Sequence, residues 1–303
     1  MIKKKIACLL TATIVGVLGQ YYIQNNKTAI EEKNQTTQTN QTNKSNKMIH
    51  PIENQKSVGE DLDSKIRFIN YPNYSQYSPN LPNNGEMYCG PAVGANIVGF
   101  LDSIGLNVLN SPIDKFNSTK LIKNLGEKMK TDKDTGTKSL FNLIEGLHIY
   151  FDERDYIANF DYKRLNENGK YEANDLITFD WIKQNSVGKK NIILSINYSK
   201  NNNIKLDNQE ELNEDNVRYH CINIVTVNKS NNNNNNNNCE LIIRDPASNI
   251  NNQYKKITLT KNENNILYIS GLNKGKYKNI YVKAAFSVDI SKKSNYLIAQ
   301  NNK

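Results

Sequence analysis

Arginine, histidine and cysteine are all scarce in this chain. It has 303 residues and 39 lysines and arginines, but only five of these are arginine, and there are three histidines and four cysteines. Without an arginine cluster to grip phosphates or base edges, the formal net charge of +9 does not indicate a nucleic-acid partner. Four cysteines in a chain of this length also exclude a small fold held together by disulfides.

Long apolar runs are missing too, which excludes a protein with several membrane spans. A spanning helix needs roughly 20 apolar residues, and the most marked apolar segment is the shorter run Ile6–Leu18. It follows the basic residues Lys3, Lys4 and Lys5, an order that is typical of an export signal. We therefore predict a signal peptide over residues 1–19 and a secreted or cell-surface protein. A membrane anchor that is not cleaved is the alternative.

Asparagine is abundant, with 52 residues, and its distribution divides the chain. Residues 20–60 are rich in Asn, Gln and Thr without apolar periodicity, so they are predicted to be a disordered linker. The rest, residues 61–303, is predicted to be one globular domain. A second run, Asn231–Asn238, separates two apolar segments and is predicted to be a loop inserted at the tip of a hairpin.

The apolar pattern of the globular part changes from helical to extended spacing along the chain. Helical spacing predicts a long helix that opens at Cys89, followed by helices over residues 120–129, 138–151 and 179–184. From residue 191 onward, apolar segments rich in isoleucine and valine predict six strands, over residues 192–196, 221–227, 239–244, 256–260, 266–269 and 280–288. Helices followed by strands indicate an α+β protein with a helical half and an antiparallel β-sheet half.

Cys89 is the first candidate for a reactive group. It precedes Gly90 and Pro91 at the start of the predicted long helix. A thiol in that place lies near the positive end of the helix dipole and near backbone N–H groups that have no helical acceptor, and both favour the thiolate. For this residue taken alone, a buried and unreactive cysteine is the alternative.

A base for this thiol has to come from three histidines. His50 lies in the predicted linker, and His148 falls in a predicted amphipathic helix, where a partly buried structural role is expected. His220 begins a predicted strand, and Asp245 ends the next one. If the two strands pair so that their isoleucines share one face, His220 lies directly opposite Asp245. Asp245 would then orient the imidazole as the third member of a triad.

The predicted register has a consequence for the remaining cysteines. It places Cys221 and Cys239 on opposite faces of the hairpin, so a disulfide between them is not expected. His220 and Cys221 are neighbours in the sequence, but adjacent side chains of a strand point to opposite faces. We therefore expect no metal site and no cofactor.

Donors for the oxyanion of a tetrahedral intermediate are sought in the polar segment before the long helix. The amide of Gln76, together with the backbone N–H of Cys89, would supply them. Asn83 and Asn84 are closer to the thiol in the sequence and stay open as alternatives.

Three segments of the chain resemble motifs of one known family. The segments Tyr88–Asn96, Tyr219–Val225 and Ile243–Ala247 look like the nucleophile, histidine and Asp-Pro motifs of the bacteriocin-processing-like cysteine peptidases, a branch of the papain superfamily. The resemblance covers about residues 66–250. It implies a papain-like cysteine peptidase fold and four roles: nucleophile Cys89, base His220, orienting residue Asp245 and oxyanion donor Gln76.

Together, the residues and the resemblance predict a secreted or cell-surface cysteine peptidase. Cys89 would attack the carbonyl of a peptide or protein substrate, His220 would transfer the proton, and an acyl-enzyme would form and be hydrolysed. A thiol acyltransferase or amidase, and a surface binding module without turnover, stay open as alternatives. No nucleic-acid partner, and no membrane beyond the N-terminal segment, is expected.

Overall fold

The computed structural model describes residues 53–109, 115–165, 176–200, 217–230, 238–248, 254–273 and 275–294. The predicted signal peptide, most of the predicted linker, His50 and residues 231–237 of the asparagine run lie outside the described residues. The helices are α2 (Glu53–Asn70), α3 (Cys89–Leu101), α4 (Lys115–Lys128), α5 (Leu140–Asp152) and α6 (Phe179–Asn185), with two short helical turns, η1 (Pro82–Gly85) and η2 (Asp102–Leu106). The strands are β1 (Tyr156–Arg164), β2 (Asn191–Ser199), β3 (Val217–Ser230), β4 (Asn238–Arg244), β5 (Lys255–Lys261), β6 (Leu267–Ser270) and β7 (Asn279–Lys292).

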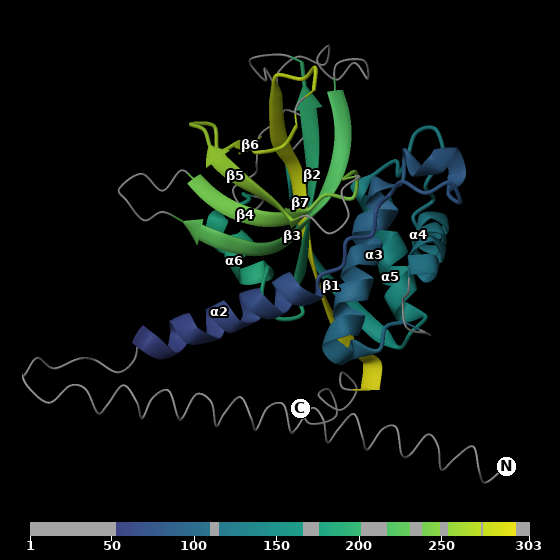
Figure 1. Ribbon diagram of the computed structural model, residues 1–303, viewed down its shortest axis with the longest axis horizontal. Helices are drawn as coiled ribbons and strands as arrows, with labels where there is room; N and C mark the ends of the chain where they lie inside the picture. Colours follow the sequence, from purple (N-terminus) through teal and green to yellow (C-terminus); the bar gives the residue numbers. More distant parts are fainter. Residues whose placement is uncertain are drawn as a thin grey trace, which may run out of the picture. The chain divides into compact units, whose positions relative to one another are not determined.

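Six antiparallel strands close into a barrel beside the helices α3, α4 and α5 (Figure 1). The strand order is β7-β2-β3-β4-β5-β6, and β6 returns to β7 at the pair Tyr268 and Tyr281. The C-terminal part of β7 also pairs with β1, over Ala284–Lys292. The length of β7 is therefore what lets one strand contact β2, β6 and β1 together.

This architecture overturns the predicted papain-like fold with its helical half followed by an antiparallel sheet half. The sheet closes on itself as a barrel, and one strand, β1, comes before the helix α6 in the chain, where the sequence predicted a clean division between helices and strands. Each predicted strand coincides with an observed one, apart from Ile266, which lies one residue outside β6. The strand pattern indicates which segments are extended, but closure depends on which strands pair, and a strand's own sequence does not carry that information.

The barrel interior explains the unbroken apolar run of β2. Ile192, Leu194 and Ile196 point into the barrel, where they join a cluster of fully buried side chains from β3, β4, β5, β6 and β7. Ile193 points outward and packs in the second cluster, which the helices form with the outer face of the sheet. Because both faces of β2 are covered, the strand carries apolar residues at consecutive positions instead of alternating ones.

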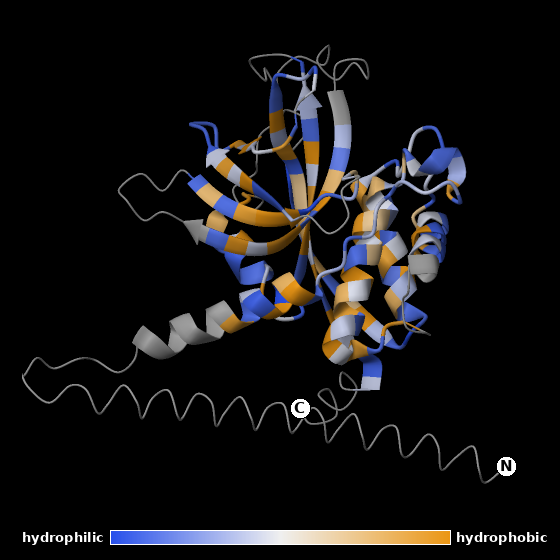
Figure 2. Cartoon of the chain, viewed as in Figure 1, coloured by the Kyte–Doolittle hydropathy of each residue, from blue (hydrophilic) through white to orange (hydrophobic). Residues whose placement is uncertain are grey.

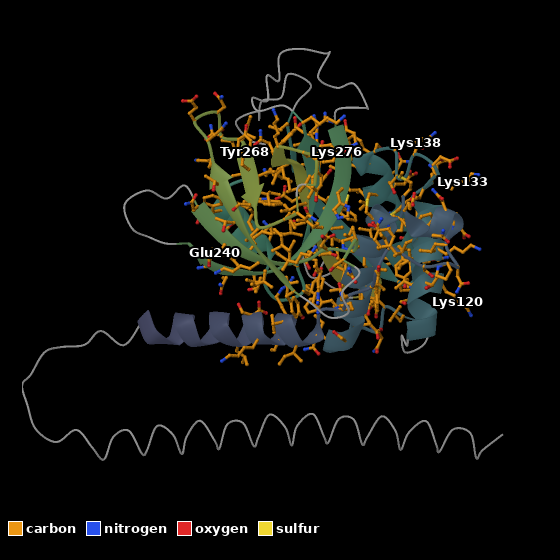
Figure 3. All side chains as sticks on the ribbon, turned by 45° about the horizontal axis from the view of Figure 1, so that its top comes forward. Lys120, Lys133, Lys138, Glu240, Tyr268 and Lys276 are labelled. Carbon is orange, nitrogen blue, oxygen red and sulfur yellow. The ribbon has the colours of Figure 1, made fainter. Side chains whose placement is uncertain are left out.

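The helix α3 contributes many of the side chains of the second cluster, and Figure 2 shows apolar colouring along it. Every residue of α3 after Cys89 is buried. By length and composition the stretch Cys89–Leu106 could cross a membrane, but 67% of it is buried inside the protein. Close packing around α3 depends on Gly146 of α5, where a Cβ atom would lie 2.4 Å from the Cγ of Met129. Charged side chains instead surround the structure, as Lys120, Lys133 and Lys138 do in Figure 3.

The helix α2 begins at Glu53, inside the segment that was predicted to be linker, and Arg67 fixes its last turn. The Arg67 guanidinium is fully buried and donates hydrogen bonds to the carbonyls of Val225 (2.6 Å), Gly188 (2.9 Å) and Lys190 (2.9 Å). A buried guanidinium is tolerated only where its donors are satisfied, and here backbone carbonyls satisfy them. Arg67 thereby joins α2 to β3 and to the start of β2.

Candidate active site

Cys89 is the first residue of α3, as the sequence predicted. The preceding residue, Tyr88, makes no side-chain cap to the helix. The first backbone N–H groups of a helix have no partner within it, so a negative charge at this end is stabilised by them and by the helix dipole. The side chain of Cys89 is partly exposed.

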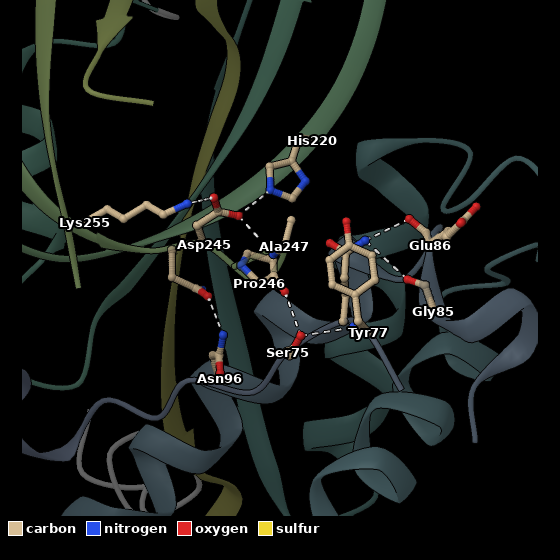
Figure 4. A network of polar contacts seen from close by, with 12 residues as sticks. Ser75, Tyr77, Gly85, Glu86, Asn96, His220, Asp245, Pro246, Ala247 and Lys255 are labelled. Atoms are coloured by element: carbon tan, nitrogen blue, oxygen red, sulfur yellow. Dashed lines mark hydrogen bonds and ion pairs between the residues drawn. The ribbon is translucent and has the colours of Figure 1, made fainter. Parts of the chain in front are cut away.

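Two buried amides hold α3 against β3. Asn223 of β3 donates through Nδ2 to the carbonyl of Val93 at 3.1 Å. Asn96 of α3, labelled in Figure 4, donates through Nδ2 to Oδ1 of Asn223 at 3.2 Å. Oδ1 of Asn96 accepts a hydrogen bond from the backbone N–H of Tyr74 at 2.7 Å. Both asparagines are fully buried. This network fixes the helix that begins with Cys89 against the strand that carries His220.

His220 of β3 contacts Asp245, which directly follows β4. The imidazole Nε2 lies 2.7 Å from Oδ1 of Asp245, and both side chains are buried. The two residues share a face, as predicted, but they are not directly opposite. Ile224 pairs with Ile243, whereas the predicted register paired it with Leu241. A shift of two residues keeps every side chain on its face, so Asp245 reaches His220 diagonally.

Asp245 is held by partners other than His220. Its Oδ2 lies 2.6 Å from Nζ of Lys255 in β5, and its Oδ1 also accepts a hydrogen bond from the backbone N–H of Ala247 at 3.0 Å (Figure 4). Burial alone would raise the pKa of Asp245, but the hydrogen bonds and charges of His220 and Lys255 outweigh it and hold the pKa well below its usual range. Asp245 is therefore a fixed carboxylate at neutral pH.

Cys89 and His220 shift the pKa of each other. The side-chain hydrogen bond with Cys221 is the largest influence on the Cys89 thiol and lowers its pKa, burial opposes it, and the hydrogen bond and charge of His220 lower it further. The pKa of Cys89 therefore lies well below that of an ordinary thiol. For His220, burial alone would lower the pKa, but the hydrogen bonds to Asp245 and Cys89 raise it to about 9. At neutral pH these directions favour a thiolate paired with an imidazolium.

Gln76 is placed next to the segment that carries Asp245. Its backbone N–H donates to the carbonyl of Pro246 at 2.9 Å, and its side chain is 1% exposed. Its Nε2 donates to the carbonyls of Glu86 at 2.8 Å and Gly85 at 3.3 Å, and its Oε1 is buried without a hydrogen-bond partner. To donate to an oxyanion, the Gln76 amide would first have to release one of these carbonyls.

The two alternative oxyanion donors, Asn83 and Asn84, instead shape the loop around Gln76. Both are exposed, and both have positive φ, at 48° and 53°. Gly85 continues the left-handed run with φ of 82°, and a Cβ atom there would lie 1.8 Å from the carbonyl oxygen of Gln76. Asparagine and glycine are the residues that adopt this conformation most readily. The left-handed backbone of this loop therefore explains why asparagine and glycine occupy these three positions.

The other histidine that the structure describes does not reach this site. His148 is exposed on α5, which corrects the expected partly buried role. Within the described residues, no group of three His, Cys, Asp or Glu side chains is placed so that it could hold a metal ion. Sequence reasoning did not identify Asn96, Asn223 or Lys255 as site residues. The only available signal was their position, in the predicted long helix, in a predicted strand and directly before a predicted strand.

Comparison with known families gives no match to this chain. No family model matches it, and no curated protein matches it. The resemblance of the cysteine, histidine and Asp-Pro segments to a peptidase family therefore stays a prediction.

Proposed function

We propose that this protein is a thiol hydrolase that cleaves peptide bonds through an acyl-enzyme. One observation supports the proposal above all others. The imidazole of His220 is held by Asp245 at 2.7 Å while it also hydrogen-bonds to Cys89 at the N-terminus of α3. Nucleophile, base and orienting carboxylate in this order are the arrangement that activates a thiol for attack on a carbonyl.

The proposed reaction uses the two nitrogens of His220 for different tasks. Nε2 is engaged by Asp245, which leaves Nδ1 for Cys89. The thiolate of Cys89 attacks the scissile carbonyl, and the imidazolium donates its proton to the leaving amine. Neutral His220 then takes a proton from water, which hydrolyses the thioester and releases Cys89. The fixed charge of Asp245 stabilises the imidazolium form and keeps the ring oriented.

The donors for the oxyanion are proposed to be the backbone N–H of Cys89 and the amide of Gln76. Removing one such donor typically costs 10²–10³-fold in kcat, roughly. The backbone N–H of Gln76 bonds to Pro246, the residue after Asp245, and its buried amide becomes a donor once it releases one of the carbonyls of Gly85 and Glu86. Export also stays a proposal, because the N-terminal residues on which it rests lie outside the described residues.

The proposed function is tested by cleavage of a peptide library. The purified, reduced protein is incubated with the library in water alone and, in parallel, with an added primary amine, and the products are identified by mass spectrometry. We expect hydrolysed peptides in water alone. If products form only with the amine, the protein is an acyltransferase and not a hydrolase. If no product forms and a thiol-reactive probe does not label the protein, the proposal is contradicted.

A further inference from the structure

A second cysteine lies against the proposed nucleophile. Cys221 follows His220 in β3, is partly exposed and packs against the cluster that α3 forms with the sheet. Asn223, two residues further on and on the same face, donates to the carbonyl of Val93 at 3.1 Å. Cys89 precedes Val93 by one helical turn.

The lengths of strand and helix bring the two cysteines together. Two residues of a strand span about 6.7 Å, and four residues of a helix span about 6 Å. His220 and Cys221, which precede Asn223, both act on Cys89, which precedes Val93, so the strand and the helix run the same way from the Asn223–Val93 contact. Going back along both elements therefore leads to Cys221 beside Cys89. Cys221 is the largest influence on the pKa of Cys89 and lowers it through its thiol and, less strongly, through its backbone N–H, while burial opposes it. His220 lowers the same pKa, so both of these neighbours in β3 act on one sulfur.

We propose that Cys89 and Cys221 form a thiol–disulfide exchange site, at which a low-molecular-weight disulfide closes a Cys89–Cys221 bond and a reducing thiol reopens it. The bond is a property of the two thiols alone, whereas its effect on turnover rests on the proposed function. The linked form has no free thiolate at Cys89 and so cannot attack a carbonyl. For an exported protein, this would make activity depend on the thiols of its surroundings.

The exchange proceeds in two balanced steps. The Cys89 thiolate attacks one sulfur of the disulfide RSSR, a Cys89–SR bond forms, and RS⁻ leaves with the proton that His220 held. The Cys221 thiol then attacks the Cys89 sulfur, gives its proton to the second departing RS⁻, and the Cys89–Cys221 bond forms. Two cysteines lose two electrons in all, and one RSSR becomes two RSH.

The surroundings favour closure of this pair over other pairings. A closed bond brings the two sulfurs to about 2.05 Å, and Asn96 and Asn223 hold the helix and the strand that carry them against each other. Cys239, the third free cysteine among the described residues, is 1% exposed inside the barrel. It is thus the natural control, because it belongs to the same chain and lies in the other cluster.

The test is oxidation of the reduced, full-length protein with oxidised glutathione, followed by acid quenching, proteolysis and mass spectrometry. We expect a linked peptide pair containing Cys89 and Cys221, which dithiothreitol separates again. Cys221→Ser should stop at a glutathione adduct on Cys89, and Cys239→Ala should behave like the wild type. A stable glutathione adduct on Cys89 of the wild type, with Cys221 still free, would overturn the proposal.

The same samples separate this proposal from the proposed function. If the linked pair forms but the reduced protein never hydrolyses a peptide, the exchange site stands and the hydrolase proposal fails. If the reduced protein hydrolyses peptides and no linked pair forms, the exchange site fails and the hydrolase proposal stands. Because the linkage is read in the wild type, a variant that does not fold leaves the test intact.

Discussion

Cys89→Ala abolishes peptide hydrolysis and leaves the protein folded. Loss of the nucleophile of a triad lowers kcat on the order of 10⁶-fold, because base and oxyanion donors have nothing left to activate. The structural cost is small, since alanine keeps the Cβ atom and the side chain of Cys89 is partly exposed. We expect a change in the free energy of unfolding within about 1 kcal/mol.

Turnover on the library-derived substrate and thermal melting, measured on the same preparation, check this expectation. His148→Ala is the matched control, because this exposed histidine lies on α5 and outside the site. It should hydrolyse the substrate at the wild-type rate. Turnover by Cys89→Ala comparable to that of the wild type would remove Cys89 from the mechanism.

Ile224→Asp prevents the barrel from folding. Ile224 is fully buried and lies between Ile192 of β2 and Ile243 of β4. A carboxylate there has no partner in the apolar interior, and an unpaired buried charge costs about 3–5 kcal/mol or more, in addition to the lost isoleucine packing. That loss is comparable with the whole stability of a domain, roughly 5–15 kcal/mol. Circular dichroism and thermal melting should show no cooperative transition.

Two controls separate this effect from a general intolerance of the sheet. Thr260→Asp places the same carboxylate at an exposed position of β5 and should melt close to the wild type. Replacing Asn231–Asn238 by Asn-Gly should preserve folding and keep activity within a few fold, because loop length costs only about 0.6 kcal/mol per doubling. The described residues that flank the run, Ser230 and Cys239, pair at the opposite end of these strands from His220 and Asp245. A normal melt for Ile224→Asp would show that the apolar face does not hold the register.

The parts of the fold that the sequence predicted are those with an uncommon local pattern. Five consecutive apolar or small residues identify β2, since burial on both faces leaves no other composition. By contrast, β1 was missed although Asn159 and Asp161 alternate with apolar residues as in a half-buried strand, because it stands among helices and apart from the other strands in the sequence. Closure of the barrel was missed because β7 has to pair with β2, as Leu194 does with Ala285, as well as with its neighbour β6. A pairing between strands as far apart in the chain as β2 and β7 leaves no trace in local spacing.

The residues of the candidate site also fall into two groups, those that the sequence indicated and those that it did not. Cys89 and His220 stood out because cysteine and histidine are rare in this chain, and Asp245 followed from the hairpin. Asn96 and Asn223 could not stand out among 52 asparagines, nor Lys255 among the many lysines. The proximity of Cys221 to Cys89 was missed because the alternation rule places Cys221 and His220 on opposite faces of the strand, whereas both lower the pKa of Cys89.

The reactivity of Cys89 rests on a thiolate that persists below the ordinary pKa of a thiol, about 8.5. The most direct measurement is the rate at which iodoacetamide alkylates Cys89 as a function of pH, followed on the Cys89 peptide by mass spectrometry. Buried Cys239, whose pKa burial raises to about 11, should stay unlabelled over the same range.

In the wild type we expect the Cys89 rate to stay high well below pH 8.5, because a lowered pKa keeps the thiolate populated as pH falls. His220→Ala should move the profile to higher pH, although not all the way to that of a free thiol, since the hydrogen bond from Cys221 remains. His148→Ala should leave it unchanged. A wild-type rate that rises only around pH 8.5, with the same profile in His220→Ala, would contradict the thiolate–imidazolium pair.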